Sequence, residues 1–440
     1  MFELNKVYNE DCRETMKRMP DNFVDSIVTD PPYELGFMGK KWDNSGIAYN
    51  VDLWKECLRV LKPGGYLLAF GGTRTSHRMV CAIEDAGFEI RDSIMWIYGQ
   101  GFPKSLNIGK EVDKLQGNER ELIKKMPAGT GPLKTGHAQK GGGGGFICDE
   151  RSPELQVTKG NSEFEGWGTA LKPAHEPICV ARKPIEEKTV AQNVLKYGTG
   201  GINIDGCRIE TENILSRGLV KGVGTMTDEL VKQGARPDTS KWNEKMYDST
   251  DNDLKGGRFP ANIILDPFTA DLLDEQAPDA GAFAKVKSGH NGKSSGIYGD
   301  YASRGDDGDT FYDDKGGASR FFYIAKAYSG ERNEGLYQFD KVRESDRVKT
   351  DGTGGANPRN RSNTNKNNFH PTVKPIKLIQ YLQRLVTPKG GTTYDPFGGS
   401  GTSGCSAINE GLNYILSEMI TEYCDIANKR LYDKAGLFLK

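Results

Sequence analysis

The chain has 440 residues, 36% of them hydrophobic, which is enough for a full core and for about two to three domains. Its 59 basic and 60 acidic residues nearly cancel, which excludes the strongly basic body of a non-specific nucleic-acid coat. No stretch approaches the roughly 18 consecutive apolar residues of a membrane span, and the N-terminus lacks a signal-peptide pattern, so we expect a cytoplasmic protein without membrane contact.

Cysteine and histidine are too scattered to indicate a metal centre. The eight cysteines form no C-x-x-C pair, and the five histidines are dispersed along the chain. We therefore expect no metal site, no disulfide scaffold and no histidine-based acid–base centre.

The first hundred residues alternate between strand and helix patterns. In chain order they predict a strand at 7–8, a helix at 13–19, a strand at 24–29, a helix at 51–61, a strand at 66–70, a helix at 77–86 and a strand at 88–98. Such alternation predicts an α/β fold with a parallel, doubly wound sheet.

A tetrapeptide that can carry chemistry follows the buried strand at 24–29, and it reads Asp30-Pro31-Pro32-Tyr33. Open α/β sheets bind their ligands at the carboxyl ends of the strands. Because proline has no N–H, the carbonyls of Asp30 and Pro31 join the carboxylate in an acceptor-only corner. Trp42 and Asp43 follow closely enough to cover this corner as a lid, or simply to pack within their loop.

From about residue 101 to 361 the alternation stops, and the sequence becomes rich in Gly, Asp and Lys. We expect a flexible linker at 141–145, a mobile loop at 351–370, and short strands at 176–181, 201–204, 261–265 and 320–325. Residues 341–374 hold eight basic and three acidic side chains, which indicates either a nucleic-acid contact or a solvated loop.

The alternation resumes at His370-Pro371-Thr372-Val373-Lys374-Pro375. A helix from 376, a strand at 391–395, a helix at 403–410, a strand at 414–418 and a helix at 422–432 are expected to follow. We therefore predict one sheet that is assembled from both ends of the chain.

The C-terminal unit has the pattern of a site for a nucleoside cofactor. One strand ends at Asp395, and a second strand ends at Glu418, 23 residues later, where its carboxylate can accept from ribose hydroxyls. The turn between them lacks both common phosphate-binding patterns, which favours a cofactor without phosphates. This glycine-rich turn reads Pro396-Phe397-Gly398-Gly399-Ser400-Gly401-Thr402.

The tetrapeptide suits a reaction at an exocyclic amine. Such an amine is a poor nucleophile, because its lone pair is delocalised into the ring. Two acceptors that each bind one amino hydrogen favour the pyramidal, nucleophilic nitrogen, and Tyr33 offers a face for an extruded base. Alone, Asp-Pro is equally a common turn former, and its pairing with the C-terminal unit is what favours catalysis.

Together the two motifs resemble those of the amino-methyltransferases of DNA, which form N6-methyladenine or N4-methylcytosine and use S-adenosyl-L-methionine (AdoMet). The catalytic motif precedes the cofactor motif, which is similar to the permuted β class. The resemblance covers about 1–100 and 365–440. It implies a Rossmann-like AdoMet methyltransferase sheet built from both chain ends, and double-stranded DNA as the substrate.

By this resemblance the turn lines the methionine side of AdoMet, Glu418 binds the ribose, Asp11 reaches the adenine, and Lys374 lies beside the cofactor carboxylate. The implied catalytic residues are Asp30, Pro31, Pro32 and Tyr33. The implied cofactor-binding residues are Asp11, Cys12, Asp30, Lys374, Asp395, Pro396, Phe397, Gly398, Gly399, Ser400, Gly401, Thr402 and Glu418.

The middle of the chain is similar to relatives from phages and bacterial mobile elements, notably at Leu171-Lys172-Pro173-Ala174-His175-Glu176-Pro177. The implied organisation is a catalytic domain in 1–100 and 361–440 with a sheet strand in 173–184, an insertion in 101–172 between two sheet strands that normally form a hairpin, and a target-recognition region in 185–360.

Several alternatives stay open. Asp30, in place of Ser or Thr, favours adenine N6 over cytosine N4 as a tendency of the family. An RNA or protein methyltransferase is disfavoured by Asp30, because those sites resemble Asn-Pro-Pro-Tyr. A catalytically silent DNA-binding protein is disfavoured by the intact motifs. Relatives often form homodimers, and the sequence does not indicate whether a restriction endonuclease accompanies the chain.

Overall fold

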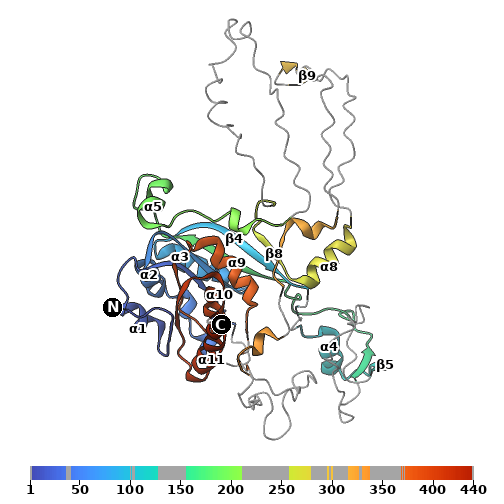
Figure 1. Ribbon diagram of the computed structural model, residues 1–440. Coiled ribbons are helices and arrows are strands. Elements are labelled where there is room, and N and C mark those ends of the chain that lie inside the picture. The colour runs from blue at the N-terminus through green and yellow to red at the C-terminus, as the bar shows by residue number, and fades with distance from the viewer. Residues whose placement is uncertain are drawn as a thin grey trace.

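The computed structural model describes residues 2–35, 41–99, 101, 105–126, 155–210, 257–278, 295–296, 299–300, 316–326, 330–336, 368, 370 and 372–438 (Figure 1). The expected linker at 141–145 and most of the basic segment 341–374 and of the loop 351–370 lie outside these residues. None of the helices in the described ranges is both long and apolar enough to cross a membrane.

The N-terminal elements follow the predicted order, with bounds that differ by a few residues. They are β1 (Lys6–Tyr8), α1 (Cys12–Arg18), β2 (Val24–Thr29), α2 (Val51–Val60), β3 (Leu61–Phe70), α3 (Ser76–Asp85) and β4 (Glu89–Ile97). Asp11 caps α1 by accepting from the backbone N–H of Arg13, and Asn50 caps α2 in the same way. The short helices η2 (Lys41–Asn44) and η3 (Ile47–Tyr49) precede α2.

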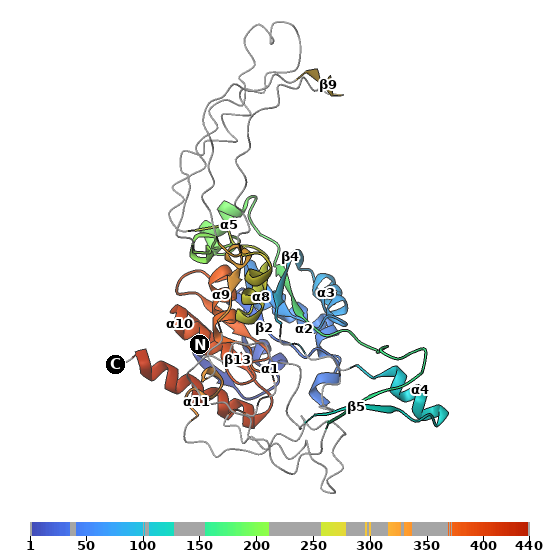
Figure 2. The same cartoon turned by 90° about the vertical axis from the view of Figure 1, so that its right-hand side faces the viewer.

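The C-terminal elements are also confirmed, and they are α9 (Ile376–Val386), β12 (Thr392–Asp395), α10 (Thr402–Glu410), β13 (Asn413–Ser417) and α11 (Thr421–Phe438). Strand β13 pairs in parallel with β1, and β12 pairs in parallel with both β13 and β2. The two ends of the chain, blue and red in Figures 1 and 2, therefore lie side by side in one sheet, as the sequence predicted.

The sheet has nine strands in the order β1-β13-β12-β2-β3-β7-β4-β8-β11. Strand β7 (His175–Arg182) runs antiparallel to both β3 and β4, as expected for the hairpin that the insertion at 101–172 interrupts, whereas β2, β3 and β4 run in the same direction as predicted. Strand β7 returns along β4 as the second arm of a hairpin, and an antiparallel partner needs no crossover helix. Between the two arms lie α4 (Ile108–Gln116) and the antiparallel pair β5 (Glu121–Met126) and β6 (Leu155–Lys159).

Helices cover both faces of the sheet. Leu67 and Ala69 of β3 pack with α1, α2 and α3, whereas Tyr66, Leu68 and Phe70 pack with α9 on the other face. This alternation follows the two-residue period of a strand. A strand buried on both faces reads as a continuous hydrophobic run, as residues 66–70 of β3 do.

The segment 185–360 contributes to the same sheet. Strands β8 (Ile263–Leu265) and β11 (Tyr323–Ile324) extend it beyond β4, so the catalytic sheet includes short parts of the region expected to recognise the target. The remaining elements of this segment are α5 (Val190–Tyr197), η4 (Asp205–Cys207), α8 (Pro267–Gln276), β9 (Ser295–Gly296), β10 (Gly299–Asp300), η5 (Ala318–Phe321) and η6 (Glu331–Asn333).

Two predicted strands of this segment need correction. Residues 201–204 form no strand, because the N–H of Asn203 donates to the carbonyl of Leu385 at the end of α9 instead of to a neighbouring strand. The strand expected at 320–325 shrinks to Tyr323–Ile324, since Ser319 donates through its N–H and its hydroxyl to Asp274, which holds the preceding residues in a 3₁₀ turn.

Candidate active site

The two predicted motifs meet at one edge of the sheet. Asp30 follows β2, Asp395 ends β12 and Glu418 follows β13, and these three strands are neighbours with the same direction. A cavity of about 1210 Å³ opens at this edge. It is lined by every residue that the sequence assigned to the site except Gly401, namely Asp11, Cys12, Asp30, Pro31, Pro32, Tyr33, Lys374, Asp395, Pro396, Phe397, Gly398, Gly399, Ser400, Thr402 and Glu418.

Asp395 organises the glycine-rich turn. Its carboxylate accepts from the Thr29 hydroxyl at 2.7 Å, from the Ser403 hydroxyl at 2.5 Å and from the backbone N–H of Phe397 at 3.0 Å. Burial raises the pKa of Asp395 to about 6. The side chain thus ties the turn to the start of α10 and to β2, the strand that leads into Asp30.

Glu418 faces the cavity with both carboxylate oxygens partly engaged. Gly399 N–H donates to Oε2 at 2.9 Å, and Ile420 N–H donates to Oε1 at 2.7 Å. Burial raises the pKa of Glu418 to about 7. Because a carboxylate offers about four acceptor positions, both oxygens can still accept from ligand hydroxyls.

The glycines of the turn serve two different purposes. A Cβ on Gly399 would lie 3.0 Å from His370 Nε2 at the cavity, so the glycine keeps the turn close to this wall. Gly401 has a φ of +80°, and a Cβ there would lie 2.9 Å from Ala427 in α11. Gly401 therefore packs behind the turn, which is why it does not line the cavity.

Asp11 and Cys12 form the wall next to Glu418. The Asp11 carboxylate accepts from the Arg13 side chain at 3.0 and 2.6 Å, and this contact lowers the pKa of Asp11. Burial raises the pKa of Cys12 to about 12, so its thiol stays neutral.

Asp30 has one engaged and one unengaged oxygen. Its Oδ2 lies 2.6 Å from the Lys374 ammonium, whereas the buried Oδ1 has no hydrogen-bond partner among the described residues. Burial raises the pKa of Asp30, and the Lys374 charge opposes that rise. A buried acceptor without a partner is costly in a folded protein, and an incoming donor can satisfy it.

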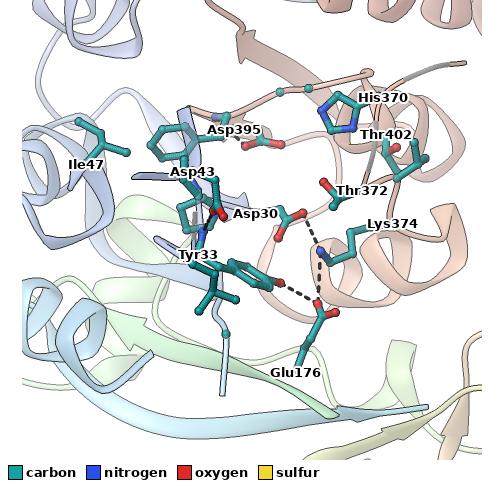
Figure 3. Close-up of a pocket in the computed structure, with 18 of the residues that line it drawn as sticks. Asp30, Tyr33, Asp43, Ile47, Glu176, His370, Thr372, Lys374, Asp395 and Thr402 are labelled. Carbon is teal, nitrogen blue, oxygen red and sulfur yellow. Dashed lines mark hydrogen bonds and ion pairs between the residues drawn. The ribbon is translucent and has the colours of Figure 1, made fainter. Parts of the chain in front are cut away.

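Tyr33 is held from three directions. Its hydroxyl donates to Glu176 at 2.6 Å, its backbone N–H donates to Asp43 at 2.8 Å, and its carbonyl accepts from the Thr75 hydroxyl at 2.7 Å. Asp43 is only 2% exposed, so of the two expectations for this residue, the structure supports packing within its loop rather than a lid over the site. The side chain of Trp42 is not among those that the structure describes. The aromatic ring is thereby fixed in orientation beside Asp30 (Figure 3).

Lys374 lines the cavity and has two partners that the sequence did not indicate. The sequence assigned it to the cofactor carboxylate, but its ammonium lies between two carboxylates of the protein, 2.6 Å from Asp30 and 3.3 Å from Glu176 (Figure 3). The nitrogen also lies 5.2 Å from the centre of the Tyr33 ring. Burial lowers the pKa of Lys374, but the two carboxylates outweigh it and raise that pKa, so the ammonium stays charged.

Glu176 and His370 received no role from the sequence. The sequence named Glu176 only as part of a segment that is similar to phage relatives. Its place at the site depends on the antiparallel direction of β7, which no local pattern indicated. His370 opens the segment that leads to α9, and its buried Nδ1 has no partner among the described residues. Burial and the Arg332 charge lower the pKa of His370 to about 3, so the imidazole is neutral.

Comparison with known proteins relates most of the chain to one family. The family model described as "N6_N4_Mtase: DNA methylase" matches residues 24–429. Among curated proteins, the Type II methyltransferase M.BamHI of Bacillus amyloliquefaciens is 43% identical over 77 residues, which cover 16% of this chain and 18% of that protein. The Type II methyltransferase M.HpaI of Haemophilus parainfluenzae is 34% identical over 108 residues, which cover 23% and 34%.

These matches span between about a fifth and a third of the length of the two curated relatives. Among solved structures, the PvuII DNA methyltransferase (cytosine-N4-specific) is aligned over 97% of this chain and 85% of that chain. Its TM-score is 0.40 and its identity is 14%, too low for the likeness to support a conclusion.

Proposed function

The chain belongs to the N6/N4 DNA methylase family, and from this we propose that it methylates the N6 amino group of an adenine flipped out of double-stranded DNA, with AdoMet as the methyl donor. One observation carries the proposal. The buried Oδ1 of Asp30, at the end of β2, has no hydrogen-bond partner among the described residues and lines the same cavity as the glycine-rich turn. An exocyclic amine is the kind of donor that this oxygen lacks.

The turn side of the cavity fits AdoMet. Glu418 offers acceptors for ribose hydroxyls, Gly399 and its neighbours let the backbone approach a ligand, and the apolar side chains of Ile420 and Tyr423 line the same wall. When bound, AdoMet supplies the methyl group from its sulfonium. The cavity exceeds the roughly 300–1,000 Å³ of a typical site for one small molecule, which supports a donor and a base sharing it.

Asp30 is assigned two tasks. Its Oδ1 accepts one amino hydrogen of the base, which draws the nitrogen toward the pyramidal form and frees its lone pair for the new N–C bond. The methylated nitrogen then carries one proton too many, and Asp30 can take that proton. The raised pKa of Asp30 supports the second task, because it makes the carboxylate a better base.

Tyr33 is assigned the face on which the base lies. Its ring stands beside Asp30 and its hydroxyl is held by Glu176, so the ring is oriented before a base arrives. A base in a duplex can reach this cavity only after extrusion from the stack, at a cost of a few kcal/mol that stacking on the ring partly offsets.

Adenine is proposed over cytosine because the tetrapeptide begins with Asp30, where Ser or Thr would favour cytosine N4. Both bases present an exocyclic amine, so the same Oδ1 could accept from either one. Residues 185–360 outside the sheet strands are proposed to read the target sequence, and Lys374 and Asp395 to Thr402 to belong to the cofactor side of the cavity. The relatives' Type II name supports a role in restriction–modification, and a homodimer is a further proposal.

The test uses the purified chain, tritiated AdoMet and duplex DNA, with chromatography of the nucleosides after digestion. We expect label in N6-methyldeoxyadenosine and its loss in Asp30→Ala. The matched control is Asp52→Ala, because Asp52 is an exposed carboxylate on α2 that does not line the cavity. Label in N4-methyldeoxycytidine would show that the target base is cytosine instead of adenine. Label in RNA but not in DNA would refute the proposal.

A further inference from the structure

We propose that Glu176 is a positioning residue of this site, which holds both Lys374 and Tyr33 in place around Asp30. The inference rests on the proposed function, because it concerns the acceptor strength of the carboxylate that would receive the amine. It assigns a role to the segment Leu171 to Pro177, which the sequence singled out without explaining.

The reversed direction of β7 brings Glu176 to the catalytic edge. In a strand parallel to β3 the first residues would lie at the opposite edge of the sheet, away from Asp30. Strand β7 is antiparallel, so its second residue, Glu176, pairs with Trp96 near the carboxyl end of β4. The carbonyl of Pro177 also accepts from Gly71 N–H, just beyond the end of β3. The hairpin of β4 and β7 thus places a second carboxylate, that of Glu176, at the site.

One oxygen of Glu176 contacts two partners. Its Oε2 accepts from the Tyr33 hydroxyl at 2.6 Å and lies 3.3 Å from Lys374 Nζ (Figure 3). Lys374 Nζ lies closer to Asp30, at 2.6 Å. The ammonium is therefore shared unequally between the two carboxylates.

The net charge around Asp30 depends on Glu176, because both carboxylates share the ammonium of Lys374. Two carboxylates and one ammonium sum to −1, which suits a cavity in which the proposed reaction passes a positive charge from the donor to the amine. Without the Glu176 charge, Lys374 would pair with Asp30 alone, and the pair would be close to neutral. Asp30 would then be a weaker acceptor and a weaker base for the amine.

The charged and titratable groups around Asp30 act in opposite directions. Apart from burial, Lys374 lowers the pKa of Asp30 and Glu176 raises it, while the Asp30 charge raises the pKa of Asp395 on β12. If Asp30 must be ionised, kcat rises with pH through the pKa of Asp30. Removal of the Glu176 charge lowers that pKa, so the acid limb of the kcat profile should move to lower pH.

The experiment measures kcat and KM for duplex DNA against pH in wild type, Glu176→Gln and Glu176→Asp. For Glu176→Gln we expect kcat to fall about tenfold, the acid limb to move to lower pH, and KM for DNA to stay unchanged. For Glu176→Asp we expect kcat to fall with the acid limb unmoved, because the charge remains but the shorter side chain cannot reach both Tyr33 and Lys374.

The matched control is Glu89→Gln, which neutralises the carboxylate paired with Arg182 at the far end of the same strand pair, 2.6 Å from its guanidinium. It should leave the acid limb and kcat as in wild type. An unmoved acid limb in Glu176→Gln would overturn the inference, and so would wild-type kcat in Glu176→Asp, which decides the matter if Glu176→Gln does not fold by circular dichroism. Failure of wild type to methylate duplex DNA would instead refute the proposed function itself.

Discussion

The carboxylate of Asp30 and the ammonium of Lys374 lie 2.6 Å apart in the lining of the cavity, although they are 344 positions apart in the chain. Their pairing joins the end of β2 to the segment before α9, and so joins the two halves of the site. It leaves Oδ1 of Asp30 as the oxygen that can accept a new donor.

Asp30→Asn should abolish most of the turnover and leave cofactor binding intact. The amide keeps the shape of the side chain but loses its charge and its capacity to take a proton, and general acid–base groups typically contribute about 10²–10⁴-fold. Single-turnover transfer of tritium to duplex DNA measures the loss, and calorimetric titration measures AdoMet binding. Asp52→Asn, at an exposed carboxylate, is the control. Turnover within a few-fold of wild type would contradict the assignment of Asp30.

Lys374→Met should destabilise the fold and move the acid limb of kcat upward. Lys374 is only 10% exposed in its side chain, and its loss leaves Asp30 and Glu176 as two carboxylates without their shared cation, a change that costs about 3 kcal/mol or more. Lys374 also lowers the pKa of Asp30, so that pKa should rise in the variant. Urea unfolding at neutral pH and the kcat profile test both parts. Unchanged stability would show that the ion cluster contributes little.

Glu418 should make the affinity for AdoMet depend on pH. Burial raises the pKa of Glu418 to about 7, so its carboxylate becomes ionised, and a better acceptor for ribose hydroxyls, as pH rises through that value. Calorimetric titration below and above pH 7 should show tighter binding at the higher pH. Glu418→Gln should bind about tenfold more weakly and lose this dependence. A pH dependence that persists in Glu418→Gln would assign it to another group.

The folded-state pKa of Glu418 also has a consequence for stability. Because this pKa lies above the usual glutamate value of 4.5, the folded protein holds the proton more tightly than the unfolded chain does. The contribution of Glu418 to stability is therefore present below about pH 4.5 and is lost as pH rises through about 7. Bound AdoMet should offset that loss, which thermal unfolding with and without the cofactor can measure.

Gly401→Ala should destabilise the protein more than Gly411→Ala. Both glycines have positive φ, +80° and +66°, but a Cβ on Gly401 would lie 2.9 Å from Ala427, whereas nothing lies within 4 Å of one on Gly411. Left-handed backbone strain costs about 1–2 kcal/mol in either variant, and crowding against α11 adds about 1–3 kcal/mol for Gly401→Ala alone. The difference between the free energies of unfolding of the two variants, measured by chemical denaturation, gives the cost of crowding against α11. Equal losses would show that α11 moves aside.

Much of the sheet could be predicted from local pattern. The strand at 66–70 is apolar along its length and the strand at 24–29 is buried at every position, because helices cover both faces of the sheet, and the alternation with helices indicated an α/β fold. The tetrapeptide at Asp30 and the turn after Asp395 were found because prolines, glycines and carboxylates at strand ends have few other reasons to occur together. The structure brings these motifs to one cavity, as the order of parallel strands required.

The sequence by itself thus determined the elements at the two ends of the chain, the two motifs and their shared edge, because these depend on residues close together in the chain. Only the tertiary structure decided the pairing of Lys374 with Asp30 and the arrival of Glu176 beside Tyr33. A buried ammonium pairs with whichever carboxylates the folded chain places around it, and Glu176 reaches Tyr33 only through the pairing of β7 with its neighbours. Neither is set by the residues next to it in sequence.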